Sequence, residues 1–108
     1  MILKIDTTDT SKIKVELINT KSNIKDQLST KQVSAQILLP TVIEILKRNK
    51  KDFKDVREIK VNIGPGSFTG TRVGVAVANA LGFALGIPVN GKKGKIVLPV
   101  YQKSKFDL

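Results

Sequence analysis

The strongest constraint on this chain is a glycine-rich segment that joins a strand pattern to a helix pattern. Residues 58–63 alternate between polar and apolar, which is typical of a strand with one buried face. Residues 64–74 then read GPGSFTGTRVG, and Val73–Leu85 is a run of small and apolar residues typical of a helix. Glycines let the backbone pass close to a neighbour, and free N–H groups at a helix start attract anions. The segment therefore predicts a tight strand-to-helix connection.

Three further strands and a first helix are predicted before this connection. The strands are Met1–Asp6, Lys12–Ile18 and Ile24–Ser29, the last with the edge charges Lys25 and Asp26. We expect Ser29 or Thr30 to cap the following helix, and Pro40 either to kink it or to mark its true first turn. The apolar stripe of this helix comprises Val33, Ile37, Leu38, Val42, Ile45 and Leu46.

The second helix is expected over Thr71–Leu85, ending at the glycine cap Gly86. A short fifth strand (86–89), a turn (91–94) and a last strand (Lys95–Tyr101) complete the pattern, and 102–108 read as a loose tail. The fold class is therefore α/β, with a mixed sheet of five to six strands and two main helices. Because the strands alternate instead of being apolar throughout, we expect both helices on one face and water on the other.

Composition narrows the chemistry. A chain of 108 residues is one small domain, and it contains neither cysteine nor histidine. Disulfides, thiolate metal sites and the Ser-His-Asp arrangement are thereby excluded, and no metal site and no cofactor is expected. Neither a signal peptide nor an unbroken apolar run of about 18 residues is present, so a cytoplasmic location without membrane contact is expected.

The net charge of +10 favours anionic partners, nucleic acid above all. The open sheet face would carry four lysines together, either as a solvated surface or as candidate RNA contacts. These lysines are Lys4, Lys12, Lys14 and Lys60.

Small residues recur every fourth position through the second helix, at Gly70, Gly74, Ala78, Gly82 and Gly86. Interior glycines cost helix propensity, roughly 1 kcal/mol each, so something must compensate. We expect another helix to approach there closely, either the first helix of this chain or a helix of another subunit. Among polar residues nearby, Asp6 is expected to cap a turn, and Ser67 and Thr69 to cap the second helix.

These residues resemble the TsaB (YeaZ) family. Residues 2–8, reading ILKIDTT, look like the family's opening strand, and the stretch from Ile37-Leu38-Leu39-Pro40 to Leu46 resembles its first helix. GPGSFTGTRVG closely matches the family signature, whose loop residues here are Gly64, Pro65, Gly66, Ser67, Phe68, Thr69 and Gly70. The resemblance implies a single actin-like ATPase (ribonuclease H-like) lobe over residues 1–90, with 91–108 as a short extension replacing the second lobe of typical members.

The resemblance also implies a function. Family members are non-catalytic partners of the paralogous enzyme TsaD, which makes threonylcarbamoyladenosine at position 37 of tRNA, assisted by the small ATPase TsaE. They hold TsaD through the helices of the first lobe, and relatives self-associate through the same surface. With the glycine stripe added, the expected interface comprises Ile37, Val42, Ile45, Gly70, Val73, Gly74, Val77, Ala78 and Leu81.

Intrinsic catalysis is not expected. The glycine loop lacks the Gly-Lys-Ser/Thr ending of a phosphate loop, and Asp6-Thr7-Thr8 lacks the glycine of the first phosphate hairpin of actin-like ATPases. A stand-alone basic RNA-binding module, or a degenerate or truncated family member, is the alternative to a scaffold subunit.

Overall fold

The computed structural model describes residues 1–31 and 34–100, folded as a mixed sheet covered by two α-helices. The strands are β1 (Ile2–Asp6), β2 (Ile13–Asn19), β3 (Ile24–Thr30) and β4 (Glu58–Val61). The helices are α1 (Ala35–Arg48), the short 3-10 turn η1 (Phe53–Asp55) and α2 (Phe68–Leu85).

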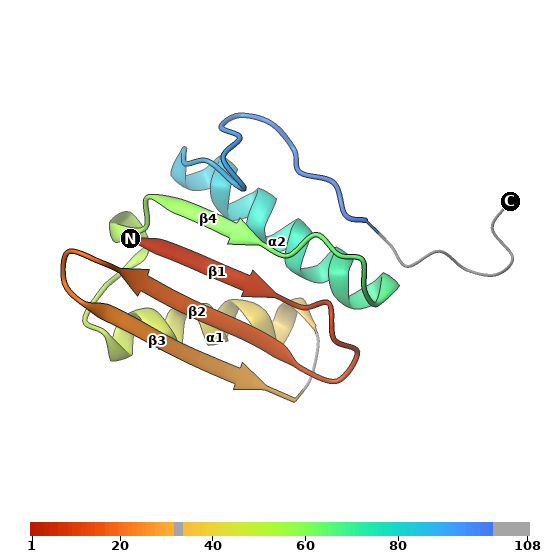
Figure 1. Ribbon diagram of the computed structural model, residues 1–108, viewed down its shortest axis with the longest axis horizontal. Coiled ribbons are helices and arrows are strands. Elements are labelled where there is room, and N and C mark those ends of the chain that lie inside the picture. The colour runs from red at the N-terminus through yellow and green to blue at the C-terminus, as the bar shows by residue number, and fades with distance from the viewer. Residues whose placement is uncertain (32–33, 101–108) are drawn as a thin grey trace, which may run out of the picture.

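The sheet has the order β3-β2-β1-β4, with β1 antiparallel to β2 and parallel to β4. Both α-helices lie behind it in Figure 1, α1 against β2 and β3, and α2 against β4 and β1. One-sided cover follows from the alternation of the strands, since Leu3, Ile5 and Ile59 are buried whereas Lys4 and Lys60 are exposed. The mixed sheet, and the placing of both helices on one face, are confirmed.

The hydrophobic core fills the space between sheet and helices. Its fully buried side chains include Leu3, Ile13 and Leu17 from the sheet and Leu38 and Ile45 from α1. In the strands these residues occupy every second position, and in the helix they occupy one face. The buried faces of sheet and helix therefore pack together as one core.

The start of α1 differs from the prediction. Ser34 caps the helix, its hydroxyl accepting a hydrogen bond from the Ile37 amide, so neither Ser29 nor Thr30 is the cap. Ser29 and Thr30 belong instead to the end of β3. Pro40 lies inside α1 in its second turn, and Val33, which was expected on the apolar stripe, lies outside the described residues.

In the described part of the chain the sheet has four strands, not the five to six predicted. Val89 makes only a single parallel bridge, to Ile59, because Asn90 and Gly91 take positive φ and turn the chain away. Residues 95–100 form no strand, and Tyr101 lies outside the described residues.

The outer border of β4 is nevertheless paired, through the main chain at Ile59 and through a side chain at Val61. The side-chain oxygen of Asn90 accepts a hydrogen bond from the main-chain N–H of Val61, and the side-chain NH₂ of Asn90 donates one to the Val61 carbonyl. Asn79 of α2 holds Val97 in the same two-way manner. Residues 87–100 therefore lie against β4 and α2 without extending the sheet.

By length and hydropathy α2 is the one helix of the described chain that could cross a membrane, with a mean hydropathy of 1.2 over its 18 residues. It is also a core helix of this fold, since Gly70, Thr71, Gly74, Val75 and Ala78 are buried against the rest of the chain. Core helices of other folds pass the same test, so one such helix is weak evidence for a span.

An ion pair ties the end of α1 to the edge strand β3. Arg48 donates to both carboxylate oxygens of Asp26, at 2.7 and 2.6 Å, and to the Gln27 carbonyl at 2.9 Å. Asn49 donates to the same carboxylate. The hydrogen bonds from Arg48 and then Asn49 hold the pKa of Asp26 well below its ordinary value.

We expect Asp26→Asn to make the stability of the protein less sensitive to acid. A carboxyl group whose pKa is lowered by folding stabilises the fold above its unfolded pKa of about 3.9, and this contribution is lost as the pH falls towards the folded value. At pH 7 the loss should stay below about 1 kcal/mol, because the pair is partly exposed. The gap in denaturant midpoint between wild type and variant should therefore close under acid conditions.

Asp9→Asn is the comparison for this prediction: hydrogen bonds from the neighbouring Ser11 also lower the pKa of the exposed Asp9, so this variant shows the same effect for a carboxylate that ties no two elements together. A gap that stays constant from pH 7 down to pH values well below about 3.9 would show that the Asp26–Arg48 pair contributes nothing to the acid dependence.

Candidate functional site

The signature loop is built onto the end of β1. The Ser67 amide donates to the Thr8 carbonyl at 2.9 Å, and the Asn62 amide donates to the Ile5 carbonyl at 2.9 Å. The peptide bond Gly64–Pro65 is cis, and Gly64 has a φ of 105°, a conformation that favours glycine. The loop thus fixes where α2 begins relative to the sheet, as the sequence predicted.

Thr7 is the central residue of this junction, and its side chain is fully buried. Its hydroxyl donates to the Gly70 carbonyl and accepts from the Gly74 amide at 3.0 Å. These are the two groups that an α-helix pairs with each other, so the hydroxyl is inserted into the first turns of α2. We call the contact of Thr7 with Gly70 and Gly74 the threonine clasp.

The clasp explains the glycines at both positions. A Cβ at Gly74 would fall on the Thr7 hydroxyl, and one at Gly70 on the Thr7 carbonyl, in each case closer than real Cβ atoms come. The expectation that another helix approaches the glycines is wrong at these positions. It is wrong at Gly82 as well, where the neighbour is Val89.

The smaller polar predictions at this junction are largely confirmed. Asp6 caps the turn after β1, accepting from the amide and hydroxyl of Thr8 at 3.0 and 2.7 Å. Partial burial raises the pKa of Asp6, but hydrogen bonds from Thr8 and Asn62 outweigh it, so the pKa lies below its ordinary value. Ser67 is the N-cap of α2, accepting from the Gly70 amide, whereas Thr69 lies within the helix.

The residues predicted for the partner interface fall into two groups. Those facing the sheet are enclosed within this chain and cannot contact a partner directly: Val42, Ile45, Gly70, Gly74 and Ala78. The remainder are half-buried, packed against the border of the core with part of each side chain accessible: Ile37, Val73, Val77 and Leu81. Apolar periodicity cannot separate the side of a helix that meets its own sheet from the side that meets a partner.

A shallow groove lies beside this second group, between the start of α1 and the first half of α2. Its lining is apolar apart from two residues at one end, and it comprises Ala35, Thr69, Arg72, Val73, Ala76 and Val77. Arg72 lies over the ring of Phe68, 5.5 Å from its centroid. We call this surface the helix groove. Of the predicted interface residues it contains Val73 and Val77.

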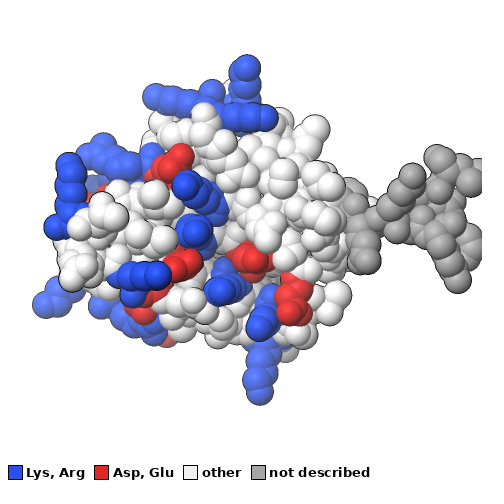
Figure 2. Space-filling model, viewed as in Figure 1, with Lys and Arg blue, Asp and Glu red and all other residues white. Residues whose placement is uncertain are grey.

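The open sheet face brings three of the four predicted lysines together. Lys4, Lys14 and Lys60 line one hollow on this face, while Lys12 precedes β2 and does not line it. Carboxylates alternate with them, since Glu16 lies opposite Lys4 and Asp6 opposite Lys14 in the register of β1 and β2. Figure 2 shows the red and blue atoms interleaved across this face. The face is therefore closer to charge balance than its lysines alone suggested.

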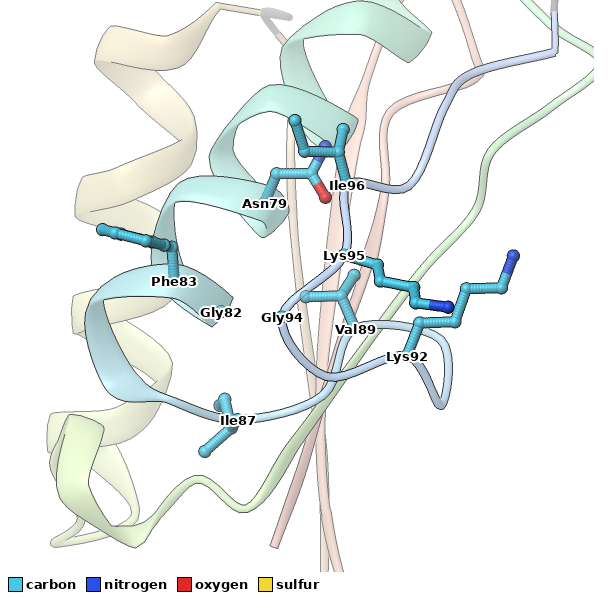
Figure 3. A pocket seen from close by; sticks show the side chains of 9 residues that line it. All are labelled: Asn79, Gly82, Phe83, Ile87, Val89, Lys92, Gly94, Lys95 and Ile96. Carbon is cyan, nitrogen blue, oxygen red and sulfur yellow. The ribbon is translucent and has the colours of Figure 1, made fainter.

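Sequence reasoning did not predict the pocket between α2 and residues 87–96. Figure 3 shows Gly82, Val89 and Ile96 around it, with the Lys92 and Lys95 side chains extending away. Its volume is about 80 Å³, well below the roughly 300–1,000 Å³ of small-molecule sites. We interpret it as a packing gap beneath the segment that Asn79 holds.

Comparisons with known proteins agree with this fold. The family model described as TsaD, tRNA N6-adenosine threonylcarbamoyltransferase, matches residues 27–91, more than half of the chain. YeaZ from Pseudomonas aeruginosa superimposes with a TM-score of 0.74 and 31% identity, over 82% of this chain and 41% of that one. The chain belongs to the TsaB (YeaZ) family.

Two curated TsaB proteins define the extent of the match. The tRNA threonylcarbamoyladenosine biosynthesis protein TsaB of Buchnera aphidicola (subsp. Baizongia pistaciae) is 32% identical over 87 residues, covering 81% of this chain and 39% of that protein. TsaB of Escherichia coli is 36% identical over 56 residues, covering 52% of this chain and 24% of its own length. The chain thus spans about two fifths or less of the length of these relatives. The element order is consistent with an actin-like, ribonuclease H-like lobe with a reduced strand count.

Proposed function

We propose that this chain is a non-catalytic subunit in the synthesis of threonylcarbamoyladenosine at position 37 of tRNA, acting by docking on a TsaD-like enzyme. The single observation that carries the proposal is the accessible helix groove on a lobe whose relatives are named for this biosynthesis. A TsaE-like ATPase would act through the complex, in the cytoplasm, and a homodimer would use the same groove. Residues 1–90 would form the docking lobe and 91–108 the extension.

The helix groove suits a helix of a related protein. Its half-buried valines, Val73 and Val77, offer apolar surface, and the small residues Ala35 and Ala76 let another backbone approach. Leu39, exposed to 39%, adds apolar surface on α1. The proposed partner would cover these residues without opening the core, because the threonine clasp and the sheet already hold α2 from its other side.

Ala76→Arg tests this docking. The long charged side chain should fill the helix groove and lower the affinity for the TsaD-like protein of the same organism at least about tenfold, which is about 1.4 kcal/mol. Pull-down and calorimetric titration with the purified enzyme measure this effect. A parallel reconstitution measures the modified nucleoside in tRNA.

Ala84→Arg is the matched control, since Ala84 is also exposed on α2 but lies outside the groove. It should bind as the wild type does. Equal binding of Ala76→Arg and wild type would place the partner on another surface.

A stand-alone RNA-binding module remains the second candidate, with contacts at Lys4, Lys12, Lys14 and Lys60. The hollow that gathers three of these lysines favours it, whereas the interleaved Asp6 and Glu16 weaken it. Salt-sensitive RNA binding in the absence of any partner protein would support this module.

A further inference from the structure

A second basic surface lies at the end of the molecule where β1 begins and α1 ends. Lys21, from the turn between β2 and β3, meets Lys51 and Arg57 around one hollow. Among the residues that the structure describes, one carboxylate, that of Asp55, lines this hollow. We call the three cationic residues the end patch.

The single carboxylate is already engaged. Asp55 accepts the Asp52 amide at 3.0 Å within the capping box of η1. The hollow around Lys4, Lys14 and Lys60, further along the same open sheet face, sets two carboxylates against its three lysines, in direct cross-strand register. The end patch therefore has the larger excess of positive charge of the two hollows.

Further basic residues surround the end patch. Lys47 and Lys50 are exposed at the end of α1, and Lys54 is exposed on η1, where it pairs loosely with Asp52 at 3.8 Å. Blue atoms gather at this end in Figure 2, on the left of the view. Such a cluster of positive charge attracts phosphate groups through its potential, and the release of counterions from the nucleic acid then favours binding.

We propose that the end patch binds RNA, with the phosphate backbone on its cationic rim. The floor of the hollow is the cross-strand pair Ile2 and Ile18, both half-buried, on which a ribose or base edge can lie. The choice of RNA among polyanions rests on the proposed function in tRNA modification.

An anionic membrane is the less suitable partner. Insertion into a bilayer requires protruding apolar side chains beside the basic residues. Among the described residues the large exposed apolar side chains lie elsewhere, on the helices and on residues 96–100. The apolar floor of the hollow is recessed between cations, which suits a nucleotide better than a lipid tail.

The test is a pair of charge-matched triple variants of the full 108-residue chain. One reverses the end patch (Lys21→Glu, Lys51→Glu, Arg57→Glu), and the other reverses the open face (Lys4→Glu, Lys14→Glu, Lys60→Glu). Both change the net charge equally, so a difference between them reports location. An unmodified tRNA transcript is the probe, read by fluorescence anisotropy across a salt series, with vesicles of anionic phospholipid as a second arm.

We expect the end-patch variant to bind the transcript at least about tenfold more weakly and with a log–log salt slope shallower by about 2, as for three lost phosphate contacts at about 0.7 each. The open-face variant should lose less. Equal losses, no binding by the wild-type chain, or vesicle binding that alone depends on the end patch would overturn the proposal. Alanine variants at the same positions replace any reversal that fails to fold.

Docking on the TsaD-like protein is measured on the same samples. An end-patch variant that docks normally but loses RNA supports both proposals. If the wild-type protein binds RNA through the end patch but does not bind the enzyme, the docking proposal is wrong and the proposed RNA site is still supported.

Discussion

Thr7→Val should lower the stability of the protein by about 2 kcal/mol, the loss typical of a buried hydroxyl with two partners. Valine keeps the shape but removes the bond to the Gly70 carbonyl and the bond from the Gly74 amide. Thermal unfolding followed by circular dichroism should show a midpoint lower by about 10 °C, since 1 kcal/mol corresponds to roughly 4–8 °C in a domain of this size.

Thr71→Val is the matched control. Thr71 is also a fully buried threonine at the start of α2, but its hydroxyl has no hydrogen-bond partner among residues 1–31 and 34–100. Removing an unpaired polar group from the core should leave the stability unchanged or raise it. Equal losses in both variants would show that the threonine clasp stabilises the fold no more than any buried threonine.

Gly74→Ala is expected to have the second large effect. It should lower the stability of the protein, although helix propensity alone would raise it. Alanine improves propensity by about 1 kcal/mol over glycine in a helix interior. The new methyl would fall on the Thr7 hydroxyl, so it must push the side chain out of the threonine clasp. Overpacking costs about 1–3 kcal/mol and the lost hydrogen bonds add to it, so a net loss of about 2 kcal/mol is expected from denaturant unfolding.

A double-mutant cycle isolates the cause. Among the nearest heavy atoms around a Cβ at position 74, all three belong to the Thr7 side chain. In a Thr7→Ala background most of the obstruction is gone, so Gly74→Ala should be neutral or stabilising there. A loss of the same size in both backgrounds would mean that Thr7 is not what requires glycine at this position.

The sequence predicted the layers of this fold because the strands are strictly alternating. In β1 and β2 the parity of Leu3, Ile5 and Leu17 alone determined which face is buried. The strand count was wrong because the segment after α2 turns away at Asn90 and Gly91, whose positive φ a single sequence does not reveal. The predicted cap of α1 is wrong because Val33, which precedes Ser34, fits the spacing of the apolar stripe and places the helix start too early.

The candidate site was predictable only in outline. The signature loop marked the start of α2, but the role of Thr7 depends on a contact with residues 63 and 67 positions away in the chain. The one sequence feature that pointed to a special role of Thr7 is its position directly after a strand that ends in Asp6. The end patch was missed because Lys21 and Arg57 are brought together by the sheet, and composition does not report which lysines share a surface.

Both borders of the sheet finish in side-chain hydrogen bonds. At β4 the Asn90 side chain hydrogen-bonds both the N–H and the carbonyl of Val61. At β3 the Asp26 carboxylate accepts from the Gln27 N–H, and Arg48 donates to the Gln27 carbonyl. An incoming strand would have to displace these groups before it could add to either border. Addition of a further strand is thereby opposed at Gln27 of β3 and at Val61 of β4.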